Sequence, residues 1–217
     1  MSRLRKQDIE QEVIKRTSAF SWNVSKGNTK LVNIPSFSLM TKQTCAGSTA
    51  LCRKHCYCKF ITVRPTVAVA WQTNTNIVKN DLSRWESEIT PYIKLLNARM
   101  FRIHVGGDFY SQRYLDAWIR ICKSNTETKF MAFTKSFVLD YSDKPDNMVI
   151  IWSLFPDTDV STVPDGYRAY TVIDGYEYTR QDQDRIDNAL RCGENCGKCA
   201  TCWFIDEKAC DVKFALH

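Results

Sequence analysis

The sequence contains no apolar run long enough to cross a membrane. Its longest runs, such as "MVIIWSLF", fall far short of the roughly 20 residues that a membrane-spanning helix needs. The N-terminal stretch "MSRLRKQDIEQEVIKR" is basic and polar, and no apolar segment follows it that would form the core of a signal peptide. These absences predict a cytoplasmic protein with no membrane partner.

The chain also lacks the signatures of several common enzyme classes. It has no Walker loop, no Rossmann fingerprint and no Ser-His-Asp order, and it shows neither an internal repeat nor a low-complexity tract. With 217 residues, of which 44% are hydrophobic and 25% charged, its composition is that of one globular domain. Because the chain contains none of these motifs, its sequence does not identify a substrate.

Cysteine, by contrast, is abundant, and eight of the ten cysteines fall into two groups. The first cysteine group comprises Cys45, Cys52, Cys56 and Cys58, and the second comprises Cys192, Cys196, Cys199 and Cys202. Because thiols stay reduced in the cytoplasm, clustered cysteines there predict metal binding rather than disulfides. Cys122 lies at helical spacing from apolar residues and is expected in the core, whereas Cys210 is ambiguous.

The spacing within the groups indicates which metal they would hold. The second group, Cys-x3-Cys-x2-Cys-x2-Cys, is close to the cysteine run of bacterial ferredoxins, so we expect an iron–sulfur cluster of the 4Fe-4S type, with zinc as the alternative. In the first group, Cys45, Cys52 and Cys56 would leave one iron open to a ligand, while Cys58 is awkwardly close to Cys56. The spacing leaves open whether the groups share one cluster.

Positive charge is concentrated in the first third of the chain. Residues 1–70 hold 12 Lys and Arg against 3 Asp and Glu, a net charge of +9, whereas the whole chain carries +6. Such a basic region predicts that the protein could meet nucleic acid. The alternative, which we favour in the absence of a nucleic-acid motif, is a solvated basic helix plus lysines that offset thiolate–metal charge.

Hydrophobic periodicity predicts the secondary structure. Residues 3–16 form an amphipathic pattern, Pro65 can start a helix through 80 (or a strand, given the β-branched residues), and Asp81 is a good N-cap. From residue 99 onward strands alternate with helices: "RMFRIHVGGDF", "KFMAFTKS", "NMVIIWSLFP" and "YRAYTVID" are the expected strands.

This alternation predicts an α/β fold. We expect a partial (β/α) barrel-like, mostly parallel sheet with a cysteine-rich C-terminal extension. The organisation would be a basic N-terminal helix and linker at 1–35, the β/α core with the first cysteine group at 36–178, and a C-terminal helix with a metal-binding segment at 179–217.

One strand, "RIHVGGDF", carries ionisable residues. Alternation puts Arg102, His104 and Asp108 on one face, and the adjacent Gly106 and Gly107 fall at the carboxyl end of the strand, where ligands collect in β/α folds. These five residues are therefore the candidate cofactor-binding set. An equally weighted alternative is that Gly-Gly-Asp is a strand-to-helix turn in which Asp108 helps to cap the next helix.

Several stretches together resemble the phage-associated gene product 88 family. They are "PSFSLMTKQTCAGSTALCRKHCYC", "RIHVGGDFYSQRYLDAWIRI", "KFMAFTKS" and the closing "CGKCATCW…VKFALH", which run from about residue 33 to the end. The chain departs from the family pattern at "TCAGS", where a proline is expected after the cysteine, and at Cys58, where alanine is usual. The resemblance implies an organisation and a phage origin, but no reaction.

A looser resemblance is to radical S-adenosylmethionine enzymes. Their three-cysteine loop follows the first strand and a Gly-Gly-Glu-like motif ends the second, as "LCRKHCYC" and "GGD" would here, although the cysteine spacing Cys-x3-Cys-x-Cys differs. The resemblance implies a phage-encoded iron–sulfur protein with a redox or radical role, S-adenosylmethionine as a further cofactor and a small-molecule ligand. The alternative is a zinc-stabilised binding or regulatory module that contacts nucleic acid.

Overall fold

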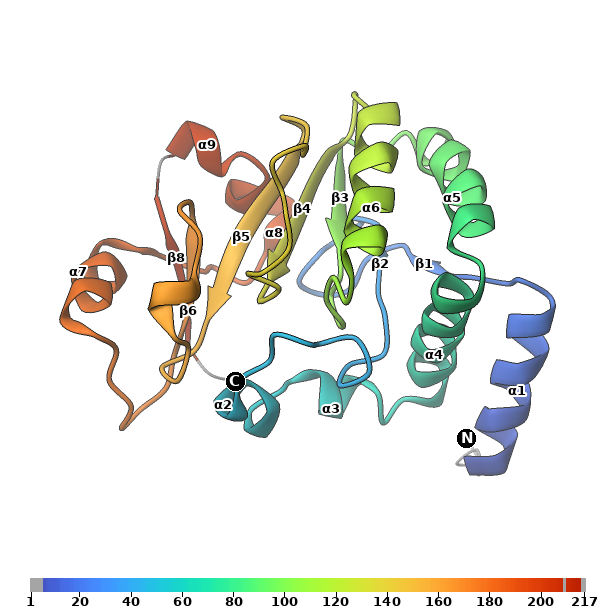
Figure 1. Cartoon of the computed structure of the whole chain (residues 1–217), viewed down its shortest axis with the longest axis horizontal. Helices are drawn as coiled ribbons and strands as arrows, with labels where there is room; N and C mark the ends of the chain where they lie inside the picture. The colour runs from blue at the N-terminus through green and yellow to red at the C-terminus, as the bar shows by residue number, and fades with distance from the viewer. Residues whose placement is uncertain (1–5, 209, 216–217) are drawn as a thin grey trace.

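The computed structural model describes residues 6–208 and 210–215, and one sheet runs through them (Figure 1). In these residues the sheet has eight strands in the order β1-β2-β3-β4-β5-β6-β8-β7. The strands are β1 (Val24–Ser25), β2 (Ser36–Phe37), β3 (Met100–Ile103), β4 (Lys129–Thr134), β5 (Met148–Leu154), β6 (Arg168–Val172), β7 (Leu190–Arg191) and β8 (Val212–Ala215).

Helices occupy much of the remaining chain. They are α1 (Lys6–Ser18), α2 (Ala50–Lys54), α3 (Cys58–Ile61), α4 (Pro65–Asn80), α5 (Leu82–Leu96), α6 (Gln112–Ser124), α7 (Arg180–Asn188), α8 (Cys196–Cys199) and α9 (Ile205–Lys208), with 3-10 turns η1 (Val160–Thr162) and η2 (Thr201–Trp203). Among the described residues, none of these helices has the length and apolar character that a bilayer crossing requires.

The strand pairing confirms the predicted α/β class with a mostly parallel sheet. The pairs from β2 through β6 to β8 and β7 are all parallel, and only β1 runs antiparallel to its neighbour β2. The described strands leave β1 and β7 as the two edges, so the pairing forms no closed ring. A partial barrel stays a prediction.

Local signals explain where the longest helices begin. Pro65 is the first residue of α4, and the preceding Arg64 is extended, as a residue before proline prefers to be. The Asp81 carboxylate accepts a hydrogen bond from the Arg84 N–H, and the Ser111 hydroxyl accepts one from the Tyr114 N–H, so each caps its helix. The helix predicted from Pro65 is confirmed, and the strand alternative for that segment is wrong.

Helices α4, α5 and α6 cover one face of the sheet with a large aromatic core. The rings of Phe37, Trp85 and Trp118 lie within 6.0 Å of one another between centroids, and Phe101 and Phe130 continue the cluster from β3 and β4. All five are fully buried. Cys122 belongs to the same core, as its helical spacing predicted.

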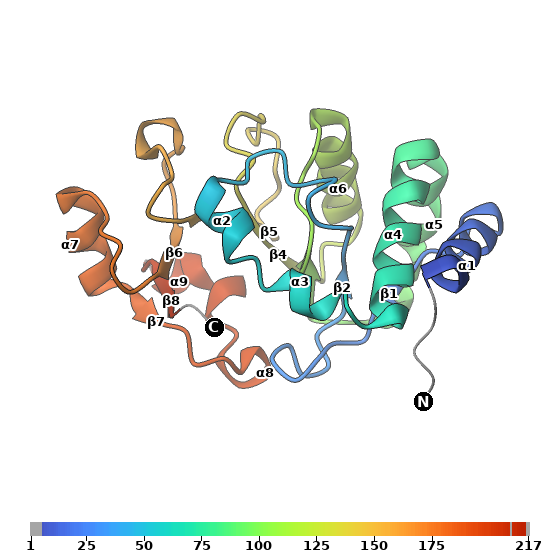
Figure 2. The same cartoon turned by 90° about the horizontal axis from the view of Figure 1, so that it is seen from below.

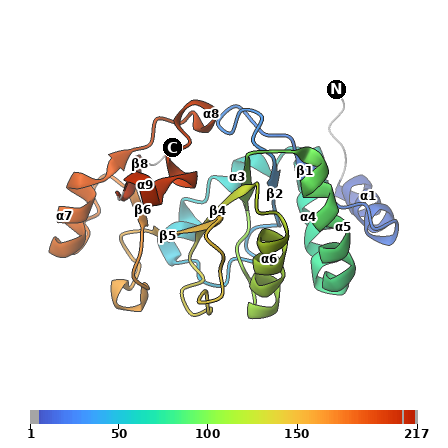
Figure 3. The same cartoon turned by 90° about the horizontal axis from the view of Figure 1, so that it is seen from above.

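The C-terminal segment covers the opposite face, so it is not an extension outside the core. Viewed along the strands, α6 and α8 lie on opposite sides of the sheet (Figure 3). Trp203 is buried against Met131, Val149 and Ile151, and its indole N–H donates to the Phe101 carbonyl oxygen at 3.0 Å. In addition, β8 inserts between β6 and β7. The described residues thus integrate the cysteine-rich C-terminal segment with the sheet and give no evidence of it as an extension.

The short helices α2 and α3 lie next to the carboxyl ends of the central strands. The arrows of β3, β4 and β5 point toward the end of the molecule where α2 and α3 are found (Figure 1), and the view from that end shows both helices in front of the sheet (Figure 2). The first cysteine group is thus at the edge where parallel α/β sheets usually bind ligands.

Candidate functional site

The first cysteine group lies beside charged side chains that follow the ends of β3, β4 and β5. Cys45 interacts electrostatically with Asp108, and Cys52 does so with Lys135, Asp108 and Asp157. Asp157 also accepts a hydrogen bond from the Leu51 N–H at 2.8 Å, which ties α2 to the end of β5. Burial raises the pKa of Cys45 to about 11 and also raises that of Cys52.

Two residues of this site, Lys135 and Asp157, were missed by the sequence analysis. Lys135 directly follows β4, and Asp157 follows β5 by three residues. Their positions after the strands "KFMAFT" and "MVIIWSL" were the available signal, because the carboxyl ends of parallel strands meet at one edge.

Asp108 joins two loops of the carboxyl edge. Its carboxylate accepts hydrogen bonds from the Thr134 hydroxyl at 2.6 Å, the Lys135 N–H at 2.8 Å and the Phe109 N–H at 2.7 Å. Burial raises its pKa, and these three donors oppose that shift. Asp108 does not cap α6, since Ser111 does, so that part of the turn alternative is wrong.

The two glycines before Asp108 are required by protein packing. A Cβ on Gly106 would lie 2.2 Å from the Trp71 ring, and one on Gly107 would lie 2.7 Å from the Leu39 side chain. Gly107 also has a φ of 84°, which side chains disfavour. Trp71 and Leu39 therefore occupy the space in which we expected a ligand.

His104 and Arg102 lie on opposite faces of the sheet, so the expectation that they share one face with Asp108 is wrong. His104 has a φ of 60°, which breaks the strand alternation and turns its ring toward the helices. There Nε2 lies 3.0 Å from the Tyr114 hydroxyl. Burial, together with the nearby Arg102 cation, lowers the pKa of His104 to about 3.

Arg102 lies between the two cysteine groups. Its Nε donates to the His104 carbonyl oxygen at 2.9 Å, and its guanidinium stacks 4.3 Å from the centre of the Phe133 ring. It interacts electrostatically with Cys58 of the first group and with Cys196 and Cys202 of the second, while burial lowers its pKa. One buried cation thus faces thiols from both ends of the chain.

The Cys56 and Cys58 thiols lie close to each other. The nearby Cys58 thiol and the backbone N–H groups of Cys58 and Lys59 stabilise the Cys56 thiolate and lower the pKa of Cys56 to about 6. The same contact and burial raise the pKa of Cys58. Cys58 is 3% exposed and lies 3.7 Å from the Val105 carbonyl oxygen, whereas Cys56 is partly exposed.

The second cysteine group gathers around α8 and η2. Cys202 interacts electrostatically with Cys192, Cys196 and Cys199, so the four thiols share one neighbourhood. Burial raises the pKa of Cys202 to about 12 and also raises that of Cys196, where Arg102 and Lys30 act in the opposite direction. Cys199 is exposed, and its sulfur lies 3.1 Å from the Thr201 hydroxyl.

Neither group has the geometry of a metal centre. In residues 6–208 and 210–215, no three His, Cys, Asp or Glu side chains are placed so that they could hold one metal ion. The assignments of individual cysteines as ligands, and of iron–sulfur, zinc or S-adenosylmethionine as cofactors, stay predictions.

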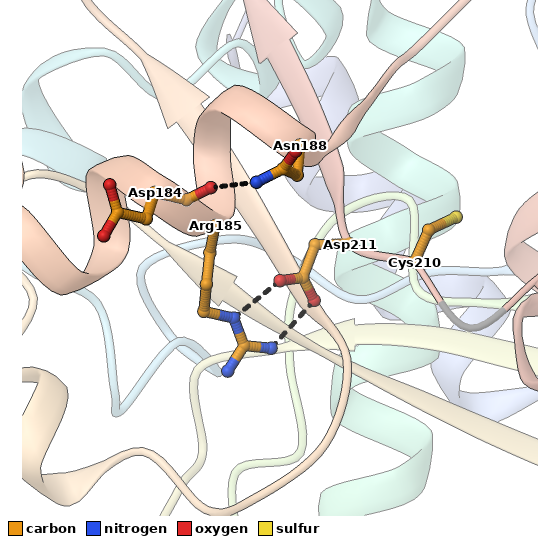
Figure 4. A pocket seen from close by; sticks show the side chains of 5 residues that line it. All are labelled: Asp184, Arg185, Asn188, Cys210 and Asp211. Carbon is orange, nitrogen blue, oxygen red and sulfur yellow. Dashed lines mark hydrogen bonds and ion pairs between the residues drawn. The ribbon is translucent and has the colours of Figure 1, made fainter.

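A pocket of about 330 Å³ lies beside α7, away from the carboxyl edge (Figure 4). Arg185 pairs with Asp211 at 2.7 Å across it, and Asn188 donates to the Asp184 carbonyl oxygen at 2.8 Å. Cys210 also lines this pocket and belongs to neither cysteine group. Arg185 and Asp211 thus neutralise each other in this pocket, and the bond from Asn188 engages the backbone of Asp184 rather than its carboxylate.

Two curated proteins resemble this chain. The Gene 88 protein of Mycobacterium phage L5 is 32% identical over 151 residues, which cover 62% of this chain and 63% of the relative. The Gene 88 protein of Mycobacterium phage D29 is 28% identical over 219 aligned residues, which cover 83% of this chain and 88% of the relative. No solved structure matches the chain significantly.

These findings correct the predicted function. An iron–sulfur protein with a redox or radical role, and its alternative, a zinc-stabilised binding or regulatory module contacting nucleic acid, both required a metal centre. The described residues contain no group arranged to hold one, and the relatives are named only Gene 88 protein. The resemblance to radical S-adenosylmethionine enzymes is likewise not supported.

The resemblance to the phage gene 88 proteins extends along most of the chain. The sequence model of the family described as Gene product 88 matches residues 14–205, from within α1 to the start of α9. Both cysteine groups and the whole parallel core through β6 lie inside this range. The chain therefore belongs to the Gene product 88 family.

Proposed function

We propose that Cys56 and Cys58 form a thiol–disulfide exchange site at the carboxyl edge of the sheet. The observation that carries the proposal is the direct contact between a partly exposed thiol and a buried one, separated by a single residue. The exposed sulfur of such a pair can meet a substrate, and the buried sulfur can resolve the product.

The distance between the Cα atoms of the two cysteines is compatible with a disulfide. Tyr57 has φ −63° and ψ −24°, which is helical geometry. In that geometry the Cα atoms of residues 56 and 58 are about 5.4 Å apart. This separation lies within the span that disulfides bridge.

The chemistry is a two-electron exchange with a disulfide substrate. The Cys56 thiolate attacks one substrate sulfur, a mixed disulfide forms, and the other substrate sulfur leaves as a thiolate. The Cys58 thiolate then attacks Cys56, releases the second substrate thiol and closes the Cys56–Cys58 disulfide. Two protons and two electrons pass from the dithiol to the substrate, and a cellular dithiol reductant restores the starting state.

Neighbouring groups favour this role for Cys56. The backbone N–H groups of Cys58 and Lys59 donate to its sulfur, and Lys135 adds a nearby positive charge. A thiolate at Cys56 is therefore stabilised more than one at Cys45 or Cys52, where burial dominates. The partner in this proposal is a small disulfide-containing molecule, and the reducing host cytoplasm is its setting because the dithiol must be regenerated there.

Peptide mapping after exposure to a disulfide tests the proposal. Protein is treated with 4,4′-dithiodipyridine, free thiols are alkylated, and cysteine linkages are identified by mass spectrometry. We expect a Cys56–Cys58 disulfide in the wild type and a trapped mixed disulfide on Cys56 in Cys58→Ala.

The matched control is Cys199→Ser, which removes an exposed thiol of the second group and should leave the Cys56–Cys58 disulfide unchanged. A wild-type protein in which the Cys56 adduct persists, with Cys58 still alkylated, would overturn the proposal. Metal content measured on the same untreated sample tests the cofactor predictions independently.

A further inference from the structure

A long acid-free stretch precedes α5. Residues 13–80 contain ten Lys and Arg and no Asp or Glu, and α2 and α3 lie in the middle of this stretch. The side chains of Arg53, Lys54, Lys59 and Arg64 on and beside these helices are exposed. Positive charge therefore gathers on one exposed part of the carboxyl edge.

The cations of this region are not neutralised by carboxylates. No ion pair involves Arg53, Lys54, Lys59 or Arg64 among the residues that the structure describes. Arg53 instead donates to Ser48, and Lys59 donates to the Lys54 carbonyl oxygen at 3.0 Å. The acidic neighbour Asp157 accepts its bond from the backbone of α2. These four charges stay available to an anionic partner.

Two aromatic rings are exposed among these cations. Phe60 is 64% exposed and Tyr57 is 48% exposed, although rings of this size normally bury most of their surface. The Tyr57 hydroxyl donates to the Val105 carbonyl oxygen, so its ring is held in place. The Lys59 ammonium lies 5.0 Å from the centre of the Phe60 ring. Exposed rings beside cations, one of them held by a hydrogen bond, offer a stacking platform.

We propose that this surface, formed by Arg53, Lys54, Tyr57, Lys59, Phe60 and Arg64, binds single-stranded nucleic acid. The cations contact backbone phosphates, and the two rings stack on unpaired bases. Proteins that bind single strands combine these two features, because every base presents a face to stack on. Tyr57 lies between the two cysteines, but the surface consists of cations and rings and uses neither thiol, so the inference does not depend on thiol exchange.

The structure favours a single strand over the other anionic partners. Reading duplex DNA in the major groove usually needs a protruding helix or strand ribbon, and α3 has only four residues. Binding to an anionic membrane through an interfacial helix needs a longer amphipathic segment with a continuous apolar face. Here two rings and the exposed Val63 side chain stand among four cations, and rings beside cations match the bases and phosphates of a single strand.

Fluorescence anisotropy with a labelled 15-nucleotide oligo(dT) tests the proposal. Phe60→Ala should weaken binding roughly 5- to 150-fold, the range found when one stacking residue is removed. Lys59→Gln should weaken binding and lower the slope of log K against log salt by about 0.7. Tyr57→Ala removes the second ring and should also weaken binding. Cys56→Ser should bind like the wild type, which separates this proposal from thiol exchange.

Exposed residues on α5 provide matched controls. Leu95→Ala removes an 83% exposed apolar side chain, and Lys94→Gln removes an exposed cation, so neither should change the affinity. Equal losses for Lys94→Gln and Lys59→Gln would mean diffuse charge attraction and would overturn the proposed surface. So would a Phe60→Ala variant with wild-type affinity, tighter binding to duplex DNA, or binding to phosphatidylserine vesicles but not to oligo(dT).

Discussion

The two cysteine groups contain the same residue type at similar density, but the fold supports them differently. The second group is attached to the sheet through Trp203, which is 1% exposed and bonded to the Phe101 carbonyl oxygen. The first group lies in and beside the short helices α2 and α3, where Phe60 is exposed and the side chains of Tyr57 and Cys58 reach the Val105 carbonyl oxygen. The second group is therefore anchored to the core by a neighbouring indole, whereas the first is held at the surface by contacts of short helices; the buried Cys58 and the exposed Cys199 show that this difference concerns the segments and not every thiol.

This difference suggests separate roles for the groups. A thiol held against a packed core changes its surroundings only if that core opens, whereas a thiol in a short surface helix can meet a reactant directly. Arg102 is common to both groups because its guanidinium faces thiols from each. Variants that alter one group and leave the other intact test this comparison.

The largest effect is expected from Trp203→Ala. Removing this fully buried indole should lower the free energy of unfolding by about 3–5 kcal/mol, because it leaves a cavity against Met131 and Ile151 and removes the hydrogen bond to the Phe101 carbonyl oxygen. Urea denaturation followed by tryptophan fluorescence or circular dichroism would measure it. A loss below about 1 kcal/mol would mean that the second group is not anchored as described.

His104→Asn should change the pH dependence of stability. Burial lowers the pKa of folded His104 to about 3, whereas the unfolded side chain titrates near 6.5, so only the unfolded state gains this proton between those values. The wild type should therefore lose stability as pH falls below 6.5, by up to about 1.4 kcal/mol per unit from this residue.

Asparagine tolerates the left-handed backbone at position 104 and does not titrate in this range. The variant should show a shallower decline between pH 6.5 and 4 when unfolding is measured by urea titration at several pH values. Equal slopes in the two proteins would contradict the assignment of a neutral buried imidazole.

Tyr57→Phe should have a smaller effect on the first group. The variant loses the hydrogen bond to the Val105 carbonyl oxygen but keeps the ring, so the free energy of unfolding should fall by about 0.5–1.5 kcal/mol. Alkylation of the neighbouring Cys58 should become faster in native buffer, and alkylation of core Cys122 should stay slow. An unchanged Cys58 rate would show that Tyr57 does not hold this segment.

The smallest effect is expected from Cys199→Ser. The thiol is exposed and contacts the Thr201 hydroxyl, so its replacement should change the free energy of unfolding by less than about 0.5 kcal/mol. Chemical denaturation of the wild type and of Cys199→Ser would measure this difference in the free energy of unfolding. A loss of several kcal/mol would instead show that Cys199 holds a metal ion in the purified protein, since the binding energy of a structural metal is also folding energy.

Much of the helix and strand pattern could be predicted from the sequence, for reasons that are local. Pro65 and Asp81 act on backbone groups within a few residues, and both start helices as expected. The strands predicted between residues 99 and 174 are also present as neighbouring parallel strands β3 to β6. The predicted alternation is wrong at His104. The left-handed backbone there ends the regular strand and turns the ring toward Tyr114.

The candidate site was predictable only in its location. "GGD" does lie at the carboxyl edge, but Gly106 meets Trp71, a residue of α4, and only the packed structure brings these two together. The contact between Cys56 and Cys58 was also missed, because closely spaced thiols were interpreted only as poor joint ligands. Lys135 and Asp157 follow other strands, which signals their place at the carboxyl edge, but only the packed structure brings them next to Cys52.

By itself the sequence determined the α/β class, the helix starts and the acid-free stretch that makes α2 and α3 basic, since these depend on propensity, capping and composition within short windows. Tertiary structure decided how each cysteine group is attached to the sheet. It did so through contacts such as that of Trp203 with Phe101, 102 residues apart, and through the insertion of β8 between β6 and β7. Such contacts form because burial of apolar surface drives distant segments together. This driving force is not directional, so a short stretch of sequence does not reveal which distant segment it will contact.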